Sequence, residues 1–168
     1  MIYPFAMLFI LLTLIAAMIG FIVIKRWGRQ EATLPASRKE TLYKDNGWVI
    51  FKEPINYGVD ELAENFQFSV VEYSDEMDVY KLCSIPPVAG IHDTYVTGLL
   101  VEFENEIILQ RIVNENEGAS SELIGINKTT KAVVTYQKIG LFNLFRFDDV
   151  TNEIIGANKA GTVRVKLK

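Results

Sequence analysis

The sequence is poor in the residues that most often build catalytic and metal centres, with one cysteine, Cys83, and one histidine, His92. A single cysteine excludes a disulfide within the chain, as a reducing compartment permits. One cysteine and one histidine cannot supply the four ligands of a closed zinc site. The sequence also lacks the glycine motifs of dinucleotide-binding folds, phosphate-binding loops and nucleophile elbows. We therefore assign no catalytic, cofactor-binding or metal-binding residue.

The one combination with the composition of a catalytic set is Cys83 with His92 and Asp93: a thiol nucleophile, its base and an orienting carboxylate. Two prolines lie between Cys83 and His92, and no spacing rule brings these two side chains into contact. We interpret Cys83 as a buried strand residue and His92 as a loop residue. We predict that the protein is not an enzyme.

Charged residues are absent from residues 5–24. A membrane-spanning helix needs about 20 apolar residues, which this run supplies, and a helix satisfies its own backbone hydrogen bonds in lipid. We predict an uncleaved transmembrane anchor with interfacial flanks over residues 1–27, with Phe5, Leu11, Ile15 and Ile24 facing lipid. The alternatives are a cleaved signal peptide, which would need a basic segment before the run, and a buried helix.

The orientation of this anchor is predicted from Lys25, Arg26 and Arg29, which follow the run, whereas no lysine or arginine precedes it. The positive-inside rule places the N-terminus outside and the C-terminal domain in the cytoplasm. Ala16 and Gly20 form a small-xxx-small pair, which lets two helices approach closely. This pair predicts homo-oligomers through the helix, and lipid contact alone is the alternative.

The charge beyond the anchor is divided unevenly, with a net charge of +4 in residues 25–44 and −8 in the rest of the chain. Residues 28–46 contain few large apolar side chains, and we interpret them as a basic linker. A basic segment suits an anionic membrane surface. The acidic remainder lacks the basic patch that nucleic acid requires, so we expect no nucleic-acid partner.

Residues 47–168 are rich in short β-type runs separated by turn residues. This spacing predicts a mostly β fold: a soluble, antiparallel β-sandwich or barrel-like domain with one short helix. Apolar residues at i, i+3, i+4 and i+7 predict the helix over residues 59–66. The alternation that follows predicts a strand over residues 66–73. Residues 94–103 and 106–113 predict a hairpin that turns at Glu104 and Asn105.

The last third of the sequence contains an internal repeat, because residues 122–128 and 153–159 match at Glu, Ile, Gly, Asn and Lys. Each copy predicts a hairpin whose turn begins at the asparagine, a residue that tolerates left-handed backbone. We expect the two hairpins to lie in one sheet. Chance similarity between hairpins is the alternative.

The most apolar stretch of the β region is residues 140–147, whose alternation places Phe142, Leu144 and Arg146 on one face. Both faces of this strand are largely apolar, so the second face needs a cover. The cover is either the predicted helix of residues 59–66 or a partner. In the second case these three residues form a candidate docking strand, because aromatic and arginine side chains dominate binding hot spots.

The anchor and the absence of a catalytic motif together indicate a membrane-anchored, non-enzymatic interaction or assembly module that acts next to a membrane protein complex. Its expected partners are the lipid bilayer and a membrane protein. The alternatives are a membrane-tethered enzyme whose active site is assembled from dispersed carboxylates, and an extracytoplasmic binding domain of an envelope assembly.

Overall fold

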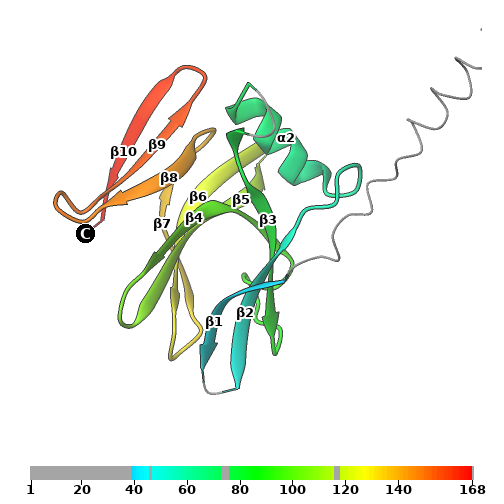
Figure 1. The fold of residues 1–168 in the computed structure, drawn as a ribbon, viewed down its shortest axis with the longest axis vertical. Helices are drawn as coiled ribbons and strands as arrows, with labels where there is room; N and C mark the ends of the chain where they lie inside the picture. The colour runs from blue at the N-terminus through cyan, green and yellow to red at the C-terminus, as the bar shows by residue number, and fades with distance from the viewer. Residues whose placement is uncertain (1–38, 46, 73–75, 116–117, 168) are drawn as a thin grey trace, which may run out of the picture. The chain divides into compact units, whose positions relative to one another are not determined.

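The computed structural model describes residues 39–45, 47–72, 76–115 and 118–167 (Figure 1). Within these ranges the elements are β1 (Glu40–Asp45), β2 (Trp48–Pro54), α2 (Glu61–Val70), β3 (Val79–Ile85), β4 (Thr94–Glu102), β5 (Glu106–Glu115), β6 (Gly118–Asn127), β7 (Val133–Lys138), β8 (Asn143–Asp148), β9 (Glu153–Asn158) and β10 (Gly161–Lys166). Every strand pair is antiparallel. The expected all-β domain with antiparallel sheets and one short helix is therefore confirmed.

The predicted membrane anchor lies outside the described residues. The same holds for the residues assigned to lipid contact, helix contact and topology: Phe5, Leu11, Ile15, Ile24, Ala16, Gly20, Lys25, Arg26 and Arg29. Within the described ranges, no helix has the length and apolar character needed to cross a membrane.

The strands form a seven-stranded sheet, in which β1 to β7 follow one another in chain order, and a three-stranded sheet in the order β10-β9-β8. Short connections favour this arrangement, because antiparallel neighbours need only a tight turn. The predicted hairpin at Glu104 and Asn105 is confirmed, since β4 and β5 pair on either side of it, with Glu102 opposite Ile107.

The seven-stranded sheet is buried on both faces along its interior strand β5. Ile107 and Leu109 join a cluster with Trp48 of β2 on one face. Successive side chains of a strand point to opposite faces, so Ile108 and Ile112 face the other way. There Ile112 packs under α2, and Ile108 packs under the three-stranded sheet. The helix and the smaller sheet thus share one face of the larger sheet.

The seven-stranded sheet is strongly curved, as Figure 1 shows. The curvature brings its first hairpin to the turn between β6 and β7. The Lys128 ammonium lies 5.5 Å from the centre of the Tyr43 ring, and the Lys131 ammonium lies 5.6 Å from the Trp48 ring. These cation–π contacts join the two ends of the sheet without strand pairing between β1 and β7 in the described residues.

The helix differs from its sequence-based prediction in position. It begins at Glu61 and continues to Val70, so the first half of the stretch predicted as a strand over residues 66–73 is helical. Phe66 and Val70, one turn apart, are both fully buried in the cluster beneath α2. This packing outweighs the local alternation, because strand propensity is weak and depends on context.

Strand β1 lies within residues 28–46, the range that composition assigns to the linker. Its Leu42 and Tyr43 pack against the cluster around Trp48, and β1 pairs with β2. The composition of this segment is typical of a linker. It forms a strand because two of its side chains are partly buried and because it pairs with β2.

The repeated segments form hairpins, as predicted, and they lie in different sheets. Residues 122–128 belong to the β6–β7 hairpin, and residues 153–159 belong to the β9–β10 hairpin. Both turns use the same device. The side-chain oxygen of Asn127 accepts backbone hydrogen bonds from Thr129 and Thr130. That of Asn158 accepts them from residues 160 and 161. The expectation of a single sheet is wrong, because the intervening β8 starts a second layer.

Candidate functional site

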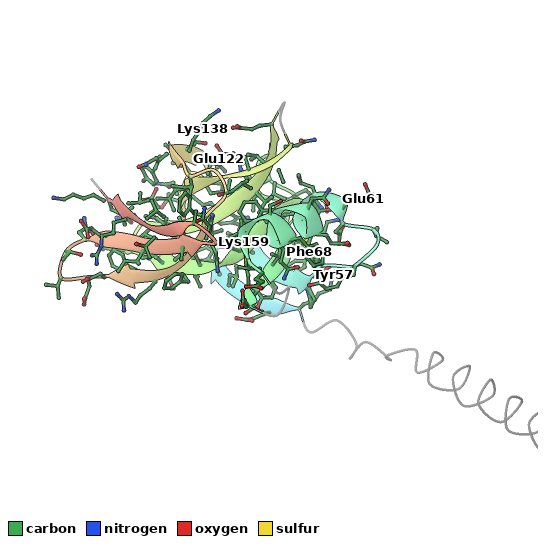
Figure 2. The ribbon with its side chains drawn as sticks, turned by 90° about the horizontal axis from the view of Figure 1, so that it is seen from above. Tyr57, Glu61, Phe68, Glu122, Lys138 and Lys159 are labelled. Carbon is green, nitrogen blue, oxygen red and sulfur yellow. The ribbon has the colours of Figure 1, made fainter. Side chains whose placement is uncertain are left out.

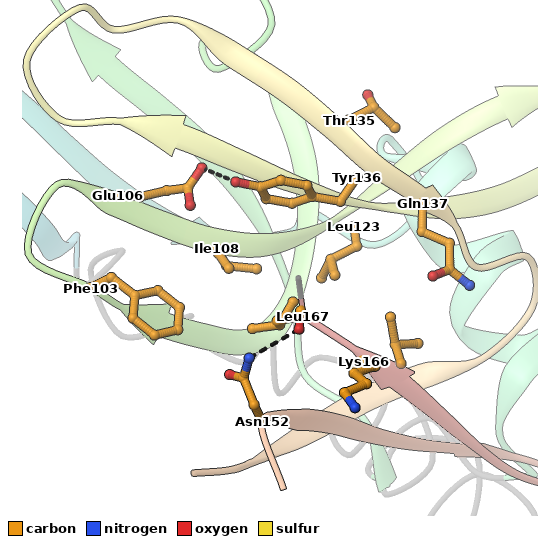
Figure 3. A pocket seen from close by; sticks show the side chains of 11 residues that line it. Phe103, Glu106, Ile108, Leu123, Thr135, Tyr136, Gln137, Asn152, Lys166 and Leu167 are labelled. Atoms are coloured by element: carbon orange, nitrogen blue, oxygen red, sulfur yellow. Dashed lines mark hydrogen bonds between the residues drawn. The ribbon is translucent and has the colours of Figure 1, made fainter.

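The candidate site is a cleft of about 320 Å³ between one face of the seven-stranded sheet and β10 (Figure 3). Its lining residues are Phe103, Glu106, Ile108, Leu123, Thr135, Tyr136, Gln137, Asn152, Val165, Lys166 and Leu167. This volume is at the lower end of the range for small-molecule and peptide-side-chain pockets. The lining combines an apolar floor with a polar mouth.

The upper wall of the cleft is built by a bulge in β7. Gln137 pairs with Leu123 and Thr135 with the next residue of β6, so Tyr136 is the extra residue between them. Its hydroxyl donates a hydrogen bond to Glu106 of β5, two strands away (Figure 3). A bulge re-aims a side chain in this way. The pKa of Tyr136 is raised to about 12, mainly by partial burial of its hydroxyl and secondly by this hydrogen bond.

Gly125, in β6, leaves room for the Tyr136 ring to reach across β6 to Glu106. A Cβ at this position would collide with the Glu106 carboxylate and lie 2.6 Å from a ring carbon of Tyr136. The equivalent glycine of the repeat, Gly156, is equally crowded: a Cβ there would lie 2.7 Å from the backbone oxygen of Asn143. Both glycines are therefore explained by the close approach of a neighbouring strand rather than by a bulge of their own.

The lower wall is formed by the end of β10 and the residue that holds it. The Asn152 side chain donates a 3.0 Å hydrogen bond to the Leu167 carbonyl, and the Leu167 N–H donates one of 3.0 Å to the Asn152 carbonyl (Figure 3). Val165 and Leu167 are buried, whereas the intervening Lys166 is exposed. Among the described residues its ammonium has no hydrogen bond or ion pair, so Lys166 leaves a free positive charge at the mouth.

The floor of the cleft is apolar and buried. Leu123 is fully buried and Ile108 nearly so. Phe103 closes one end, where its ring meets that of Phe147 edge to face with centroids 5.7 Å apart. An apolar floor favours burial of an apolar group from a ligand, and the polar groups at the mouth set that group's orientation.

A buried amide holds the two sheets at this spacing. The Gln110 side chain is fully buried and accepts hydrogen bonds from the Leu144 N–H (2.8 Å) and the Thr97 hydroxyl (3.1 Å). Its NH₂ group donates to Ser121 (2.8 Å) and to the Phe142 carbonyl. The amide thus makes hydrogen bonds with both its oxygen and its nitrogen. Because two of these bonds reach the start of β8, Gln110 fixes the three-stranded sheet to the larger one.

The residues of the candidate docking strand do not share one environment. Leu144 is fully buried in the core between the sheets, Phe142 is half-buried against that core, and Arg146 is exposed. A bulge between Leu144 and Arg146 interrupts their alternation. The exposed aromatic of β8 is Phe145, 54% exposed, which lines a second groove with Lys159 of the β9–β10 turn.

The helix α2 does not cover β8 from the outside. It packs on the larger sheet, and its end meets the β9–β10 turn. There Lys159 donates a 2.8 Å hydrogen bond to the Phe68 carbonyl, and its backbone N–H donates one of 3.2 Å to Val70 (Figure 2). The apolar face of β8 that the sequence analysis singled out is therefore covered mainly by the seven-stranded sheet.

Cys83, His92 and Asp93 lie in one neighbourhood, but their hydrogen bonds differ from those of a catalytic set. His92 accepts a backbone hydrogen bond from Ser84 at Nδ1 (3.1 Å), and Lys81 pairs with Asp93 (3.3 Å). Cys83 is buried, and this burial raises the pKa of its thiol. A raised pKa lowers the fraction of nucleophilic thiolate.

The cleft contains few ionisable groups that could act in catalysis. Of its described lining residues only Glu106 is a carboxylate, and it accepts the hydrogen bond from Tyr136. The pair of convergent carboxylates that the enzyme alternative requires is not brought together there. In the described part of the chain, no group of three His, Cys, Asp or Glu side chains could hold a metal ion.

The sequence analysis did not identify this cleft. Its residues come from β5, β6, β7 and β10, together with the β4–β5 turn, the turn before β9 and the residue that follows β10. The glycine matched between the two repeats, at positions 125 and 156, is a sequence signal at this place, because a glycine inside a strand suggests a bulge or a close approach of backbone. Comparison of the chain with protein-family models, with curated proteins and with solved structures found no match.

Proposed function

We propose that this protein is a non-enzymatic interaction module, held at a membrane by residues 1–27, that binds a partner through the cleft between its sheets. The observation that carries the proposal is the cleft itself: an apolar floor, a polar mouth and Lys166, whose ammonium makes no ion pair with any described residue. The anchor raises the effective concentration of the domain near other membrane proteins, because it confines the domain to the plane in which they lie.

The proposed topology has the N-terminus outside and the β domain in the cytoplasm, next to a membrane protein complex. The charge asymmetry around residues 5–24 supports it. A Val150→Cys substitution in a Cys83→Ser background tests the topology, because Val150 is 91% exposed on the β8–β9 turn. We expect a membrane-impermeant maleimide to label this cysteine only after cell lysis. Labelling of intact cells would instead support the extracytoplasmic alternative.

The binding proposal is tested by a photo-crosslinking amino acid placed at Gln137, which lines the cleft and is exposed. The full-length protein is expressed in its own cells and irradiated in intact membranes. We expect a discrete adduct from Gln137. The matched control carries the crosslinker at Val150, which lies outside the cleft and is 91% exposed, and should give no such adduct. An adduct of equal yield from both positions, or none from Gln137, would contradict the proposal.

A further inference from the structure

Three large apolar side chains are exposed on α2 and on the turn before it. Tyr57 is 56% exposed, Val59 67% and Phe68 52%. The Tyr57 hydroxyl donates a 3.0 Å hydrogen bond to the side chain of Gln67, the residue before Phe68 (Figure 2). This bond holds the turn against the second half of the helix, and we call Tyr57, Val59 and Phe68 the apolar patch. Single exposed apolar residues are normal, whereas a group of them marks an interaction site.

The apolar patch lies at the end of the domain where the chain enters it. Lys39, the first described residue, forms a 2.8 Å ion pair with Glu53 of β2. Strand β2 ends at the next residue, Pro54, and Tyr57 lies in the loop that follows. Pro54, Tyr57 and Gln67 line one open hollow beside α2. The start of β1 and the apolar patch therefore share one end of the domain, which we call the entry end.

The chain before Lys39 limits how far the entry end can move from a membrane. Residues 28–38 join the proposed anchor to Lys39. Even fully extended, they span only about 40 Å. That length is close to the diameter of a domain of this size, whose expected radius of gyration is about 14 Å. The entry end is therefore held within about one domain diameter of the bilayer.

The charges at the entry end supply no attraction to anionic lipid. Its two lysines, Lys39 and Lys52, are paired with Glu53 and Glu40 at 2.8 and 3.2 Å. Glu61, in the first turn of α2, is exposed. Contact with a bilayer must therefore come from apolar side chains. Aromatic rings suit this role, because they lie at the level of the lipid headgroups with their apolar part towards the acyl chains.

We propose that the apolar patch inserts into the surface of the bilayer that holds the anchor, so that the domain lies on the membrane by its entry end. The proposal rests on the proposed function, since it requires the anchor, and it adds a second contact with the same bilayer. The β1–β2 and β6–β7 turns then face away from the membrane. They approach each other at the opposite end of the sheet, where Lys131 lies 5.6 Å from the Trp48 ring.

The test uses the full-length protein in phosphatidylcholine vesicles, with an environment-sensitive fluorophore on one cysteine in a Cys83→Ser background. The label sites are Val59→Cys, in the apolar patch, and Val134→Cys, 50% exposed on β7 near the β6–β7 turn. We expect the Val59→Cys label to emit at shorter wavelength than the Val134→Cys label. A nitroxide-labelled lipid should quench it severalfold more strongly. Equal emission and equal quenching at the two sites would overturn the proposal.

Phe68→Glu places a charge in the apolar patch without disturbing the core, because Phe68 is exposed. It should return the emission of the Val59→Cys label to that of the Val134→Cys label. Val134→Glu is the matched control, since it puts the same charge on a similarly exposed apolar position, and it should leave the Val59→Cys label unchanged. No effect of Phe68→Glu, or an equal effect of both substitutions, would contradict the proposal.

Washing the vesicles with alkaline carbonate separates this proposal from the proposed function. If the protein stays with the vesicles while the Val59→Cys label emits as it does in water, the anchor stands and insertion of the apolar patch is wrong. If carbonate removes the protein, the anchor is wrong, and the proposal that depends on it falls with it.

Discussion

Replacement of Gln110 by methionine removes the polar link between the two sheets while keeping the length of the side chain. Gln110 has no solvent exposure, so no bulk water replaces its hydrogen bonds. Two backbone groups lose their partner, the Leu144 N–H and the Phe142 carbonyl. Ser121 keeps its 2.6 Å hydrogen bond to the Gly140 carbonyl. The Thr97 hydroxyl also loses its acceptor, but a hydroxyl can rotate, so the loss falls mainly on the backbone at the start of β8.

An unsatisfied buried polar group costs about 1–3 kcal/mol, so Gln110→Met should lower the free energy of unfolding by about 2–6 kcal/mol. That is a large fraction of the roughly 5–15 kcal/mol by which domains are stable. Denaturant unfolding, followed by circular dichroism on the full-length protein in micelles, measures the change. Hydrogen exchange at the Leu144 amide should accelerate in the variant, which locates the loss at the junction of the sheets.

Gln137→Met is the matched control, since it makes the same chemical change at an exposed position on β7. It should change the free energy of unfolding by no more than about 0.5 kcal/mol. If the free energy of unfolding of Gln110→Met is within about 1 kcal/mol of that of Gln137→Met, the buried amide does not hold the sheets together. The argument that this amide fixes the spacing of the two sheets at the cleft then fails.

The remaining predictions concern a crowded glycine and two tyrosines. In a thermal unfolding assay, Gly156→Ala should destabilise the protein by about 1–3 kcal/mol, because its Cβ would meet a backbone oxygen at 2.7 Å. Gly98→Ala should be near neutral in the same assay, because the atom nearest to its Cβ would be 3.7 Å away. The pKa of Tyr95, whose hydroxyl donates to buried Asp60, is raised to about 12, as is that of Tyr136. The folded state therefore holds these protons more tightly than the unfolded state, so stability should fall as pH rises from about 10 to about 12. Tyr95→Phe should flatten this fall, and an unchanged slope would contradict the assignment.

Local patterns in the sequence were sufficient for most of the strands and turns, although they missed β1 and predicted a strand over part of α2. Alternating apolar residues and turn residues identified the β class and the hairpin at Glu104 and Asn105. The repeated asparagines at 127 and 158 identified two further hairpins, because an Asx turn depends only on its own neighbours. For a similar reason residues 5–24 predict a membrane anchor, because transfer into lipid depends on composition and length; this prediction lies outside the described residues.

Tertiary structure decided the rest, because it depends on pairs of residues far apart in the chain. Packing beneath α2 converted a stretch with strand-like alternation into helix. The buried amide of Gln110, in β5, placed β8 over the larger sheet and made Leu144 a core residue. The cleft forms where the end of β10 lies over residues of β5, β6 and β7, which are distant from it in the sequence. Periodicity records which side chains are buried, and it carries no information about which strands meet.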